Sequence, residues 1–228
     1  MNFFRNVIVR QPERVLLREQ ILTLAPSNPG KTLDVGGGNG NRYRGYFNTN
    51  DFQSLDLNPD SKPDILASAD KIPLSENTID TILSSQMLEH VINPFVCLKE
   101  MIRVLKPGGS LIITIPQSNE MHSEPDDYWR FTKFGIIFLL EQAGFKVETV
   151  LQRGNYPSCL AQMRIRRLID SKSVYSNKVW LYPIWLYSLF YSRFAIRMDS
   201  FYTSYGSKKH ALGRAVLAKK PPDLVLEI

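Results

Sequence analysis

The 228-residue sequence contains only two cysteines, Cys97 and Cys159, which lie far apart and without paired spacing. This scarcity argues against a disulfide framework and against a zinc site, and it fits a reducing compartment. The stretch MNFFRNVIVRQPERVLLREQ at the start has no long apolar core and no small-residue cleavage site, so we expect no signal peptide. Internal repeats and low-complexity tracts are also lacking. We therefore expect a cytoplasmic globular protein with one domain over residues 1–228.

Acidic residues are scarce in the last third of the chain. Residues 1–150 contain 15 Lys and Arg against 18 Asp and Glu, whereas residues 151–228 contain 13 against 4. A partner attracted by positive charge would therefore meet the chain in its C-terminal third. Nucleic acid is not favoured as that partner, because the same region holds a long apolar run and no RNA-binding motif.

Short apolar segments alternate with helical patterns along most of the chain. Strands are expected over 32–35, 52–57, 64–68, 78–86, 110–116, 146–153 and 213–220. Helices are expected over 11–24, 93–105 and 131–145, and KPGG at 106–109 supplies a stop for the second of them. This alternation predicts an α/β fold, a Rossmann-like doubly wound sheet of seven mostly parallel strands. Ligands of such sheets bind beyond the carboxyl ends of the strands.

The stretch LDVGGGNG follows the first expected strand, where that rule places a cofactor. A dinucleotide site has the pattern G-x-G-x-x-G, whereas Gly36 and Gly38 begin a G-x-G-x-G pattern here. Asp34 would repel a pyrophosphate, but it can accept hydrogen bonds from a cationic or amino group. Asp56 ends the second strand, where an acid binds ribose hydroxyls. The pattern therefore favours a ligand with an ammonium group over one with phosphates.

Four motifs occur in a particular order: LDVGGGNG, LDLNP, SADKIPLSENTIDTILSSQMLEHV and VLKPGGSLIITIP. In that order they resemble the successive motifs of class I S-adenosylmethionine-dependent methyltransferases, of the type 11-like group. The resemblance covers roughly residues 30–153 and 213–220. It implies S-adenosyl-L-methionine as the cofactor, and a last strand antiparallel to the others.

The resemblance implies roles for the residues of the first two motifs. Asp34, Gly36 and Gly38 would hold the amino acid end of the cofactor. Asp56 would bind the ribose hydroxyls, and Leu57 would lie beside the adenine.

The later motifs carry further implied roles. Asp70 would accept a hydrogen bond from the adenine amino group, with Lys71 flanking it in place of the small apolar residue common there. Ser85 and Gln86 would pack near the methionine part. His90, in LEH, is a candidate for substrate binding, although a lone histidine at a helix start is more often a structural hydrogen-bonding group.

The segment MHSEPDDYWRFT, residues 121–132, contains a histidine, three acids, three aromatics and an arginine. A hydroxyl acceptor needs a base to remove its proton as the methyl group transfers. His122, Asp126 and Asp127 are the candidate catalytic residues, with Glu124 as another carboxylate nearby. The alternative for one of the acids is a helix cap or an ion pair.

The same segment offers candidate substrate contacts. Tyr128 and Trp129 could stack on a sugar or an isoprenoid, and Arg130 could clamp a phosphate or pair with an acid. Thr132 is expected to cap the following helix. Similar segments occur in methyltransferases that resemble enzymes of surface-polysaccharide biosynthesis. Metal ligands are not clustered in the sequence, so we expect no metal site.

Residues 154–210 fall outside the usual family pattern and form a basic, aromatic-rich helical insert between the last two strands. SCLAQMRIRRLIDSK reads as a basic amphipathic helix, and VWLYPIWLYSLFYSRF is apolar but too short to span a membrane and interrupted by Pro183. Aromatic residues with basic neighbours suit a membrane interface, which would make the protein peripheral on the inner face. A lid over the acceptor and a homodimer contact are the alternatives.

Together these features predict an S-adenosylmethionine-dependent methyltransferase that O-methylates a glycan or a lipid-linked glycan. One alternative is methylation of a lipid or a quinone-like small molecule, with the aromatic insert as its pocket. Another is a non-catalytic cofactor-binding protein that uses the insert as a membrane or partner anchor.

Overall fold

The computed structural model describes residues 11–171 and 178–223, and the chain divides into two compact units. We call the first the sheet unit, which comprises Ile21–Pro116, Met121–Leu151 and Ala215–Ile228. We call the second the helical unit, which comprises Met1–Gln20, Gln117–Glu120 and Gln152–Arg214. The expectation of a single domain over residues 1–228 stays a prediction.

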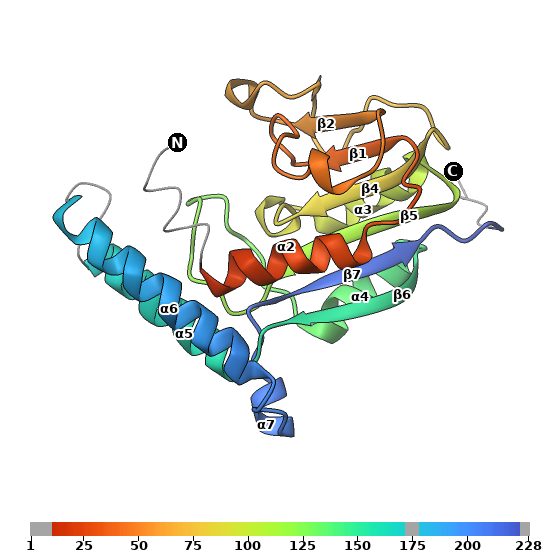
Figure 1. The fold of residues 1–228 in the computed structure, drawn as a ribbon. Coiled ribbons are helices and arrows are strands. Elements are labelled where there is room, and N and C mark those ends of the chain that lie inside the picture. The colour runs from red at the N-terminus through yellow and green to blue at the C-terminus, as the bar shows by residue number, and fades with distance from the viewer. Residues whose placement is uncertain (1–10, 172–177, 224–228) are drawn as a thin grey trace. The chain divides into compact units, whose positions relative to one another are not determined.

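The described residues form one seven-stranded sheet in the order β3-β2-β1-β4-β5-β7-β6 (Figure 1). Its strands are β1 Thr32–Val35, β2 Phe52–Asp56, β3 Ile65–Leu66, β4 Ile79–Ser85, β5 Leu105–Pro116, β6 Lys146–Arg153 and β7 Gly213–Lys219. The pairs β1·β2, β1·β4, β2·β3 and β4·β5 are parallel. The strand order reverses beside β1, which puts the switch point between β1 and β4.

Strand β7 runs antiparallel to β5. The N–H of Gly108, near the start of β5, donates to the carbonyl of Lys220, just after β7. The N–H of Gln117, just after β5, donates to the carbonyl of Leu212, just before β7. The predicted doubly wound α/β fold with an antiparallel last strand is therefore confirmed.

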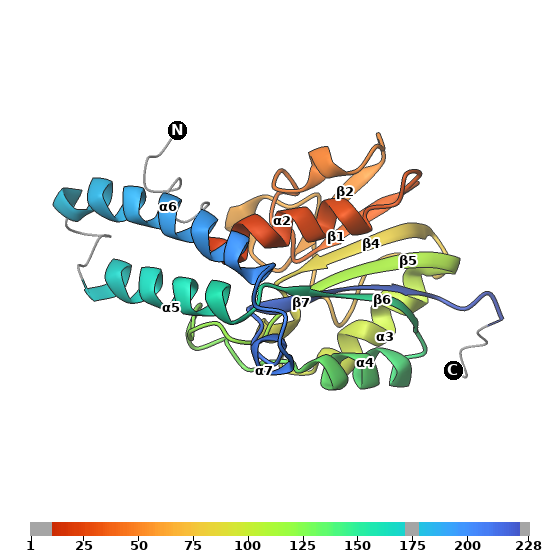
Figure 2. The same cartoon turned by 60° about the horizontal axis from the view of Figure 1, so that its bottom comes forward.

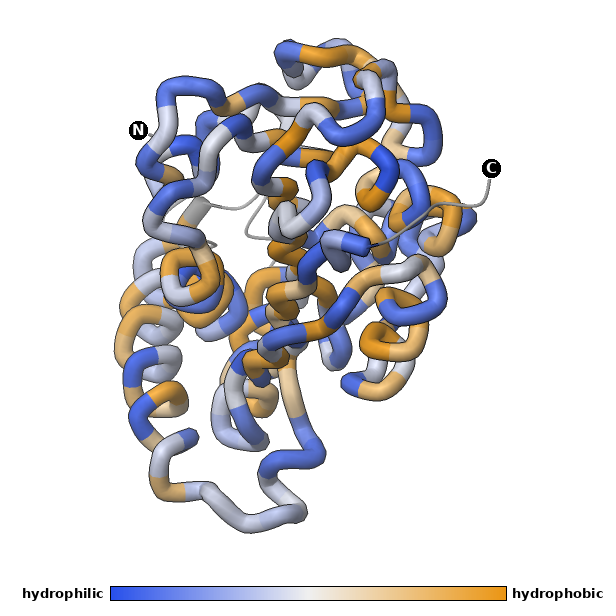
Figure 3. The backbone as a smooth tube through the Cα atoms, turned by 90° about the vertical axis from the view of Figure 1, so that its right-hand side faces the viewer, coloured by the Kyte–Doolittle hydropathy of each residue, from blue (hydrophilic) through white to orange (hydrophobic). Residues whose placement is uncertain are grey.

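The α-helices of the described residues are α2 Pro12–Leu24, α3 Pro94–Val104, α4 Lys133–Gln142, α5 Tyr156–Ser171, α6 Leu181–Asp199 and α7 Tyr205–Lys208. Short 3₁₀ turns are η1 Arg44–Tyr46, η2 Pro59–Ser61, η3 Leu88–His90 and η4 Lys178–Trp180. Hydrophobic and hydrophilic residues alternate along the helices (Figure 3), which is the pattern of helices with one buried face.

Two local expectations about helix ends can be checked. Thr132 caps α4 as expected, because its hydroxyl accepts from the N–H of Gly135 at 3.0 Å. The expectation that KPGG ends α3 is wrong in detail. Helix α3 ends at Val104 and β5 begins at Leu105, so KPGG lies within the strand. The pairing of β4 with β5 shifts register there, and a bulge of this kind accommodates the proline and glycines.

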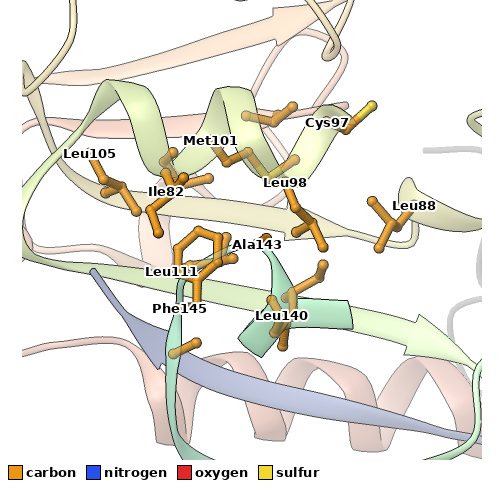
Figure 4. Close-up of a cluster of buried hydrophobic side chains, with 14 of the residues drawn as sticks. Ile82, Leu88, Cys97, Leu98, Met101, Leu105, Leu111, Leu140, Ala143 and Phe145 are labelled. Atoms are coloured by element: carbon orange, nitrogen blue, oxygen red, sulfur yellow. The ribbon is translucent and has the colours of Figure 1, made fainter. Parts of the chain in front are cut away.

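The core of the sheet unit lies between the sheet and the two helices α3 and α4. Leu98 and Met101 from α3 and Leu140 from α4 are fully buried, and they converge on Ile82 of β4 and Leu111 of β5 (Figure 4). These side chains hold β4 and β5 in place, so the loops that follow the two strands start from a rigid base.

The helical unit contains the antiparallel pair α5 and α6, which lie side by side in two views (Figures 1 and 2). Ile165 and Ile169 of α5 pack with Ile184 of α6. Ser158, near the start of α5, hydrogen-bonds Asp199 at the end of α6. These contacts fix the opposite directions of the two helices.

Helix α6 is not interrupted by Pro183, contrary to the sequence-based expectation. Pro183 is the third residue of α6, and a proline in the first turn removes an N–H that has no intrahelical partner. Residues 172–177, which include Lys172 of the expected insert, lie outside the described residues. In the part of the chain that the structure describes, no helix has both the length and the apolar character to cross a bilayer.

A buried cation organises the helical unit. The side chain of Arg153 is fully buried and pairs with the Glu13 carboxylate at 3.2 Å. Its other nitrogens donate to the side-chain oxygen of Gln20 at 3.0 Å and to the carbonyl of Arg214 at 3.3 Å. Because each nitrogen of this guanidinium has a partner, the cation is satisfied without water.

Candidate active site

A cavity of about 970 Å³ lies in the sheet unit, at the carboxyl ends of β1, β2 and β4. This is the position in which open α/β sheets bind ligands, and the volume suits a cofactor together with a small acceptor group. The lining includes eight of the site residues expected from the sequence: Gly36, Asp56, Leu57, Asp70, Gln86, His90, Asp126 and Tyr128.

The other expected site residues do not line this cavity. They are Asp34, Gly38, Lys71, Ser85, His122, Asp127, Trp129 and Arg130. The lining also contains residues that sequence reasoning missed, among them Asn58, Met87, Ser123 and the stretch from Val91 to Asn93. These positions follow β2, β4 and β5, where no periodic pattern marks a residue as facing a ligand.

The glycine turn after β1 passes very close to its neighbours. Gly36 has a φ of 75°, and a Cβ at this position would lie 2.3 Å from Cγ of buried Met87. A Cβ at Gly37 would lie 2.2 Å from Oδ2 of Asp34. Glycine is therefore required here both by the left-handed backbone and by the close approach to the strand end.

Asp34 lies beneath this turn and is buried, with 1% of its surface exposed. Among the described residues, its Oδ2 atom has no hydrogen-bond partner. Burial is the main cause that raises the pKa of Asp34 to about 7, with the charge of Asp56 acting in the same direction and the charges of Arg42 and Arg44 opposing it. A buried carboxylate without a partner is costly, and a cationic group held at the turn would stabilise its charged form.

Asp56 ends β2 and holds the turn from the other side. One carboxylate oxygen accepts from the N–H of Gly38 at 2.8 Å, and the other accepts from the N–H of Asn58 at 2.9 Å. Each carboxylate oxygen has a second lone pair, so Asp56 can still accept hydrogen bonds from ligand hydroxyls in the cavity. Gly38 thus contributes through its backbone N–H to Asp56 and does not line the cavity itself.

Gln86 follows β4 and has a φ of 54°, a left-handed conformation that is uncommon for residues other than glycine. Such strain collects at functional sites, and Gln86 lines the cavity as does Ser123, which has a φ of 57°. Ser85 points elsewhere, because its hydroxyl bonds Thr114 at 3.1 Å and Tyr43 at 3.2 Å.

The charged side chains that line the cavity are acidic. Asp56, Asp70 and Asp126 line it, and the lining residues that the structure describes include no lysine or arginine. Lys71 is exposed and lies outside the lining. An acidic cavity disfavours a pyrophosphate and favours a ligand with positive charge. Cys97 also lines the cavity, but burial raises the pKa of its thiol to about 12, so it is not a thiolate nucleophile.

The segment after β5 places His122 against a fixed carboxylate. Nδ1 of His122 lies 3.5 Å from Oδ2 of Asp127, and the backbone N–H of His122 donates to the same oxygen at 2.9 Å. Arg130 binds both oxygens of Asp127 at 2.7 Å. This bidentate pair holds the pKa of Asp127 well below its usual range. Asp127 is therefore a permanent anion that orients the imidazole.

His90, Asp126 and Tyr128 form a second group on the cavity wall. Nδ1 of His90 bonds the backbone carbonyl of Asp126, and the hydroxyl of Tyr128 donates to the Asp126 carboxylate at 2.9 Å. Trp129 lies outside the lining, and its indole N–H donates to the carbonyl of Val91 at 2.9 Å. The loop is thus tied to the end of β4 by its own side chains.

Glu89, His90 and His122 are the described residues whose side chains come together as a group that could hold a metal ion. The sequence predicted no metal site, because Glu89 and His90 are separated from His122 by more than thirty residues. In the sequence, only the motif LEH places two potential metal ligands next to each other. The third, in the loop after β5, comes close to them only in the folded chain.

Comparison with known proteins agrees with this geometry. Residues 33–113 match the family model of a methyltransferase domain. The chain is 32% identical over 101 residues to the ubiquinone/menaquinone biosynthesis C-methyltransferase UbiE of Chromobacterium violaceum, covering 36% of this chain and 41% of that protein. It therefore spans about two fifths of the length of the curated relatives it matches.

Solved structures share the fold at low sequence identity. A SAM-dependent methyltransferase from Aquifex aeolicus matches with a TM-score of 0.52 and 22% identity, over 67% of this chain and 93% of that one. The [4+2]-cyclase SpnF matches with a TM-score of 0.60 and 18% identity, over 90% and 80%. Because a cyclase is among these neighbours, the shared fold does not by itself assign the reaction. The order of the strands and the glycine turn agree with the match of residues 33–113 to a methyltransferase domain, and the chain has the fold of the solved SAM-dependent methyltransferase.

Proposed function

We propose that the protein transfers a methyl group from S-adenosylmethionine to an oxygen of a glycan or a lipid-linked glycan. The observation that carries the proposal is the acidic cavity beside the glycine turn, with the buried, unpartnered Oδ2 of Asp34 beneath it. S-adenosylmethionine supplies an electrophilic methyl group on a sulfonium, together with an ammonium, a ribose and an adenine. The residues present fit each of these parts.

The cofactor contacts follow from the positions of the acids. Asp34 offers its charge to the ammonium end, and Asp56 offers its free lone pairs to the ribose hydroxyls. Leu57 and Asp70 line the far part of the cavity, where an apolar surface and an acceptor suit an adenine ring with its amino group. Gln86 follows β4 and lines the cavity, and we assign it to the methionine part.

Loss of the acceptor's proton depends, in this proposal, on His122. Asp127 is fixed by Arg130 and has a lowered pKa, so it is a poor proton acceptor and a good orienting group. The Asp126 carboxylate accepts a hydrogen bond from the Tyr128 hydroxyl. It can also receive the proton that the acceptor hydroxyl loses. Nδ1 of His122 lies 3.5 Å from Oδ2 of Asp127, so the fixed carboxylate orients the imidazole.

The acceptor would meet Tyr128, which lines the cavity with 47% of its surface exposed. An exposed tyrosine ring at a cavity mouth suits stacking on a sugar. Arg130 is less suited to clamping a phosphate, because its guanidinium already binds both oxygens of Asp127. We therefore place the glycan part of the acceptor in the cavity and any phosphate outside it.

Helix α6 supports a lipid-linked acceptor and a peripheral location on a membrane. Phe190 and Phe194 of α6, and Phe201 just after it, are 59–68% exposed. Arg193 and Arg197 are also exposed, and their spacing from Phe190 and Phe194 puts them on the same helical face. Aromatic rings with arginines suit the interface of an anionic membrane. The same face could instead bind a second copy of the chain.

A lipid or quinone-like acceptor is the second candidate, and the similarity to UbiE favours it. A cofactor-binding protein without catalysis is the third. The first two differ in the acceptor alone, so a single labelling experiment separates them.

Purified protein would be incubated with methyl-labelled S-adenosylmethionine and a lysate of its source cells, and then extracted with organic solvent. We expect label in a product that a glycosidase or mild acid converts to a water-soluble methyl sugar. Label in an organic-phase product resistant to both treatments would overturn the glycan assignment in favour of a lipid. Binding of S-adenosylhomocysteine without any transfer would overturn the enzymatic proposal. His122→Asn should abolish transfer, and His210→Asn is the matched control.

A further inference from the structure

Three side chains from two separate segments meet beside the cavity of the sheet unit. Glu89 and His90 belong to η3, after β4, and His122 belongs to the loop after β5. Their ligand atoms all lie within 4.8 Å of one another. Nε2 of His90 lies 3.9 Å from Oε1 of Glu89, and the two imidazole rings meet edge to face at 4.9 Å. The Glu89 side chain is fully buried, and the histidine side chains are 24% and 30% exposed.

Both imidazoles are oriented through Nδ1. His90 must donate from Nδ1 to the carbonyl of Asp126, because a carbonyl only accepts. His122 directs Nδ1 toward the Asp127 carboxylate at 3.5 Å, and Arg130 fixes that carboxylate. In the neutral ring, a proton on Nδ1 leaves a lone pair on Nε2. Metal-binding histidines are held in this way, by a carbonyl or a carboxylate on the other ring nitrogen.

The composition of the group selects the class of ion. Two imidazoles and one carboxylate form the ligand set of open zinc sites, in which a fourth position is left for water or substrate. Magnesium and calcium prefer oxygen ligands, whereas imidazole suits zinc and its neighbours in the transition series. We propose that Glu89, His90 and His122 bind one divalent transition-metal ion.

The distances require only a modest closing of the group. Ligand atoms at about 2.1 Å from one tetrahedral ion stand roughly 3.4 Å apart. The pair Nε2 of His90 and Oε1 of Glu89 is near this value at 3.9 Å. The separations, which reach at most 4.8 Å, have to shrink by up to about 1.4 Å to complete such a shell. His122 can supply this shift, because its side chain is partly exposed and lies in a loop.

The metal site adds a catalytic role to the proposed function. That role depends on the protein being a methyltransferase, whereas binding of the ion does not depend on it. His90 lines the cavity, so the open position of the ion faces the acceptor. A hydroxyl bound there loses its proton more readily. Because Nε2 of His122 is then a ligand of the ion, the acceptor's proton passes not to His122 but to the Asp126 carboxylate, which also lines the cavity. The new O–CH₃ bond then forms as the S–CH₃ bond of the cofactor breaks, and no oxidant or reductant is needed.

The test is zinc binding by tag-free protein that has been stripped with a chelator and dialysed. Calorimetry and elemental analysis should find one Zn²⁺ per chain, with Mg²⁺ failing to compete. His122→Asn and Glu89→Gln should each weaken zinc binding by at least about 10-fold. The chain has only three histidines, so His210→Asn is the matched control, and exposed Glu141→Gln is the control for charge.

Controls for folding use a readout that does not involve the metal. His122→Asn should keep the affinity for S-adenosylhomocysteine and the thermal midpoint of the wild type. Glu89 is buried, so His122→Asn remains decisive if Glu89→Gln fails to fold. Absence of zinc binding by the wild type, or equal binding by wild type and His122→Asn, would overturn the proposal. Zinc binding without methyl transfer to any acceptor would leave the metal site standing and overturn the proposed function instead.

Discussion

Replacing Asp34 with asparagine should make the protein more stable and at the same time unable to hold its cofactor. Asp34 is buried beneath the glycine turn, and its Oδ2 atom has no partner among the described residues. Asparagine has nearly the same shape but carries no charge. The substitution Asp34→Asn therefore removes the cost of a buried carboxylate and removes the group expected to bind the cofactor's ammonium.

The magnitude follows from the pKa of Asp34, which burial raises from 3.8 to about 7. A raised carboxyl pKa means that the folded state binds the proton more tightly than the unfolded state. Protonated Asp34 therefore contributes its full share to the free energy of unfolding below pH 4, and this share is lost as the pH rises through 7. A difference of about three pH units corresponds to ~4 kcal/mol as an upper limit. Asp34→Asn should recover part of this at pH 8.

Two measurements at pH 5.5 and pH 8 test this reasoning. Urea unfolding without cofactor should show the wild type losing stability between the two pH values, with the loss much smaller in Asp34→Asn. At pH 8 the variant's thermal midpoint should rise by several degrees, at roughly 2–4 °C per kcal/mol for a chain of this size. Asp51→Asn, at an exposed acid in the same unit, is the control and should change neither quantity.

Cofactor affinity supplies the other half of the test. Calorimetry with S-adenosylhomocysteine should show wild-type binding that weakens as the pH falls below 7, because the Asp34 carboxyl must lose its proton to meet an ammonium. Asp34→Asn should bind at least about 10-fold more weakly at pH 8, which is about 1.4 kcal/mol, and should lose the pH dependence. Wild-type affinity in Asp34→Asn, or an unchanged pH profile, would refute the assignment of Asp34.

Three further substitutions have definite expected outcomes. Gly36→Ala places a methyl group on Met87 at a left-handed φ, so S-adenosylhomocysteine binding should disappear in calorimetry and stability should fall by more than about 1 kcal/mol; intact binding would contradict the tight turn. Arg153→Met removes the buried cation that pairs with Glu13 at 3.2 Å and leaves only the longer pairing with Arg14 at 3.6 Å, so urea unfolding should show a loss of about 3–5 kcal/mol. A neutral effect would mean that Arg14 or water compensates Glu13. Asp127→Asn should lower kcat on the order of 10²-fold with cofactor affinity unchanged, and an unchanged kcat would remove Asp127 from the orienting role.

The fold was predictable because its signals are local. Strand β5 is a continuous apolar run, β1 ends in a cluster of glycines, and α3 carries apolar residues at helical spacing. These periodicities arise from side chains within one element, so they can be read without knowing the rest of the chain. KPGG was assigned wrongly to a helix stop for the same reason. The bulge that takes it into β5 depends on pairing with β4, which no local pattern reveals.

The candidate site was predictable in part. Asp34, Gly36 and Asp56 stand at fixed places relative to β1 and β2, so strand geometry alone brings them together. The roles of the residues in the segment after β5 were not predictable, because they depend on contacts between residues that lie far apart in the sequence. Only the structure shows that Arg130 is committed to Asp127, that Asp127 faces His122, and that Tyr128 rather than Trp129 lines the cavity.

The sequence by itself determined the order of the elements, the turn beneath which a cationic ligand can sit, and the uneven placement of charge, since each is a property of neighbouring residues. The tertiary structure decided which distant side chains share a site. Glu89 and His90 meet His122 because the ends of β4 and β5 adjoin in a parallel pair. Parallel strands bring their carboxyl ends to one edge of the sheet whatever the length of chain between them.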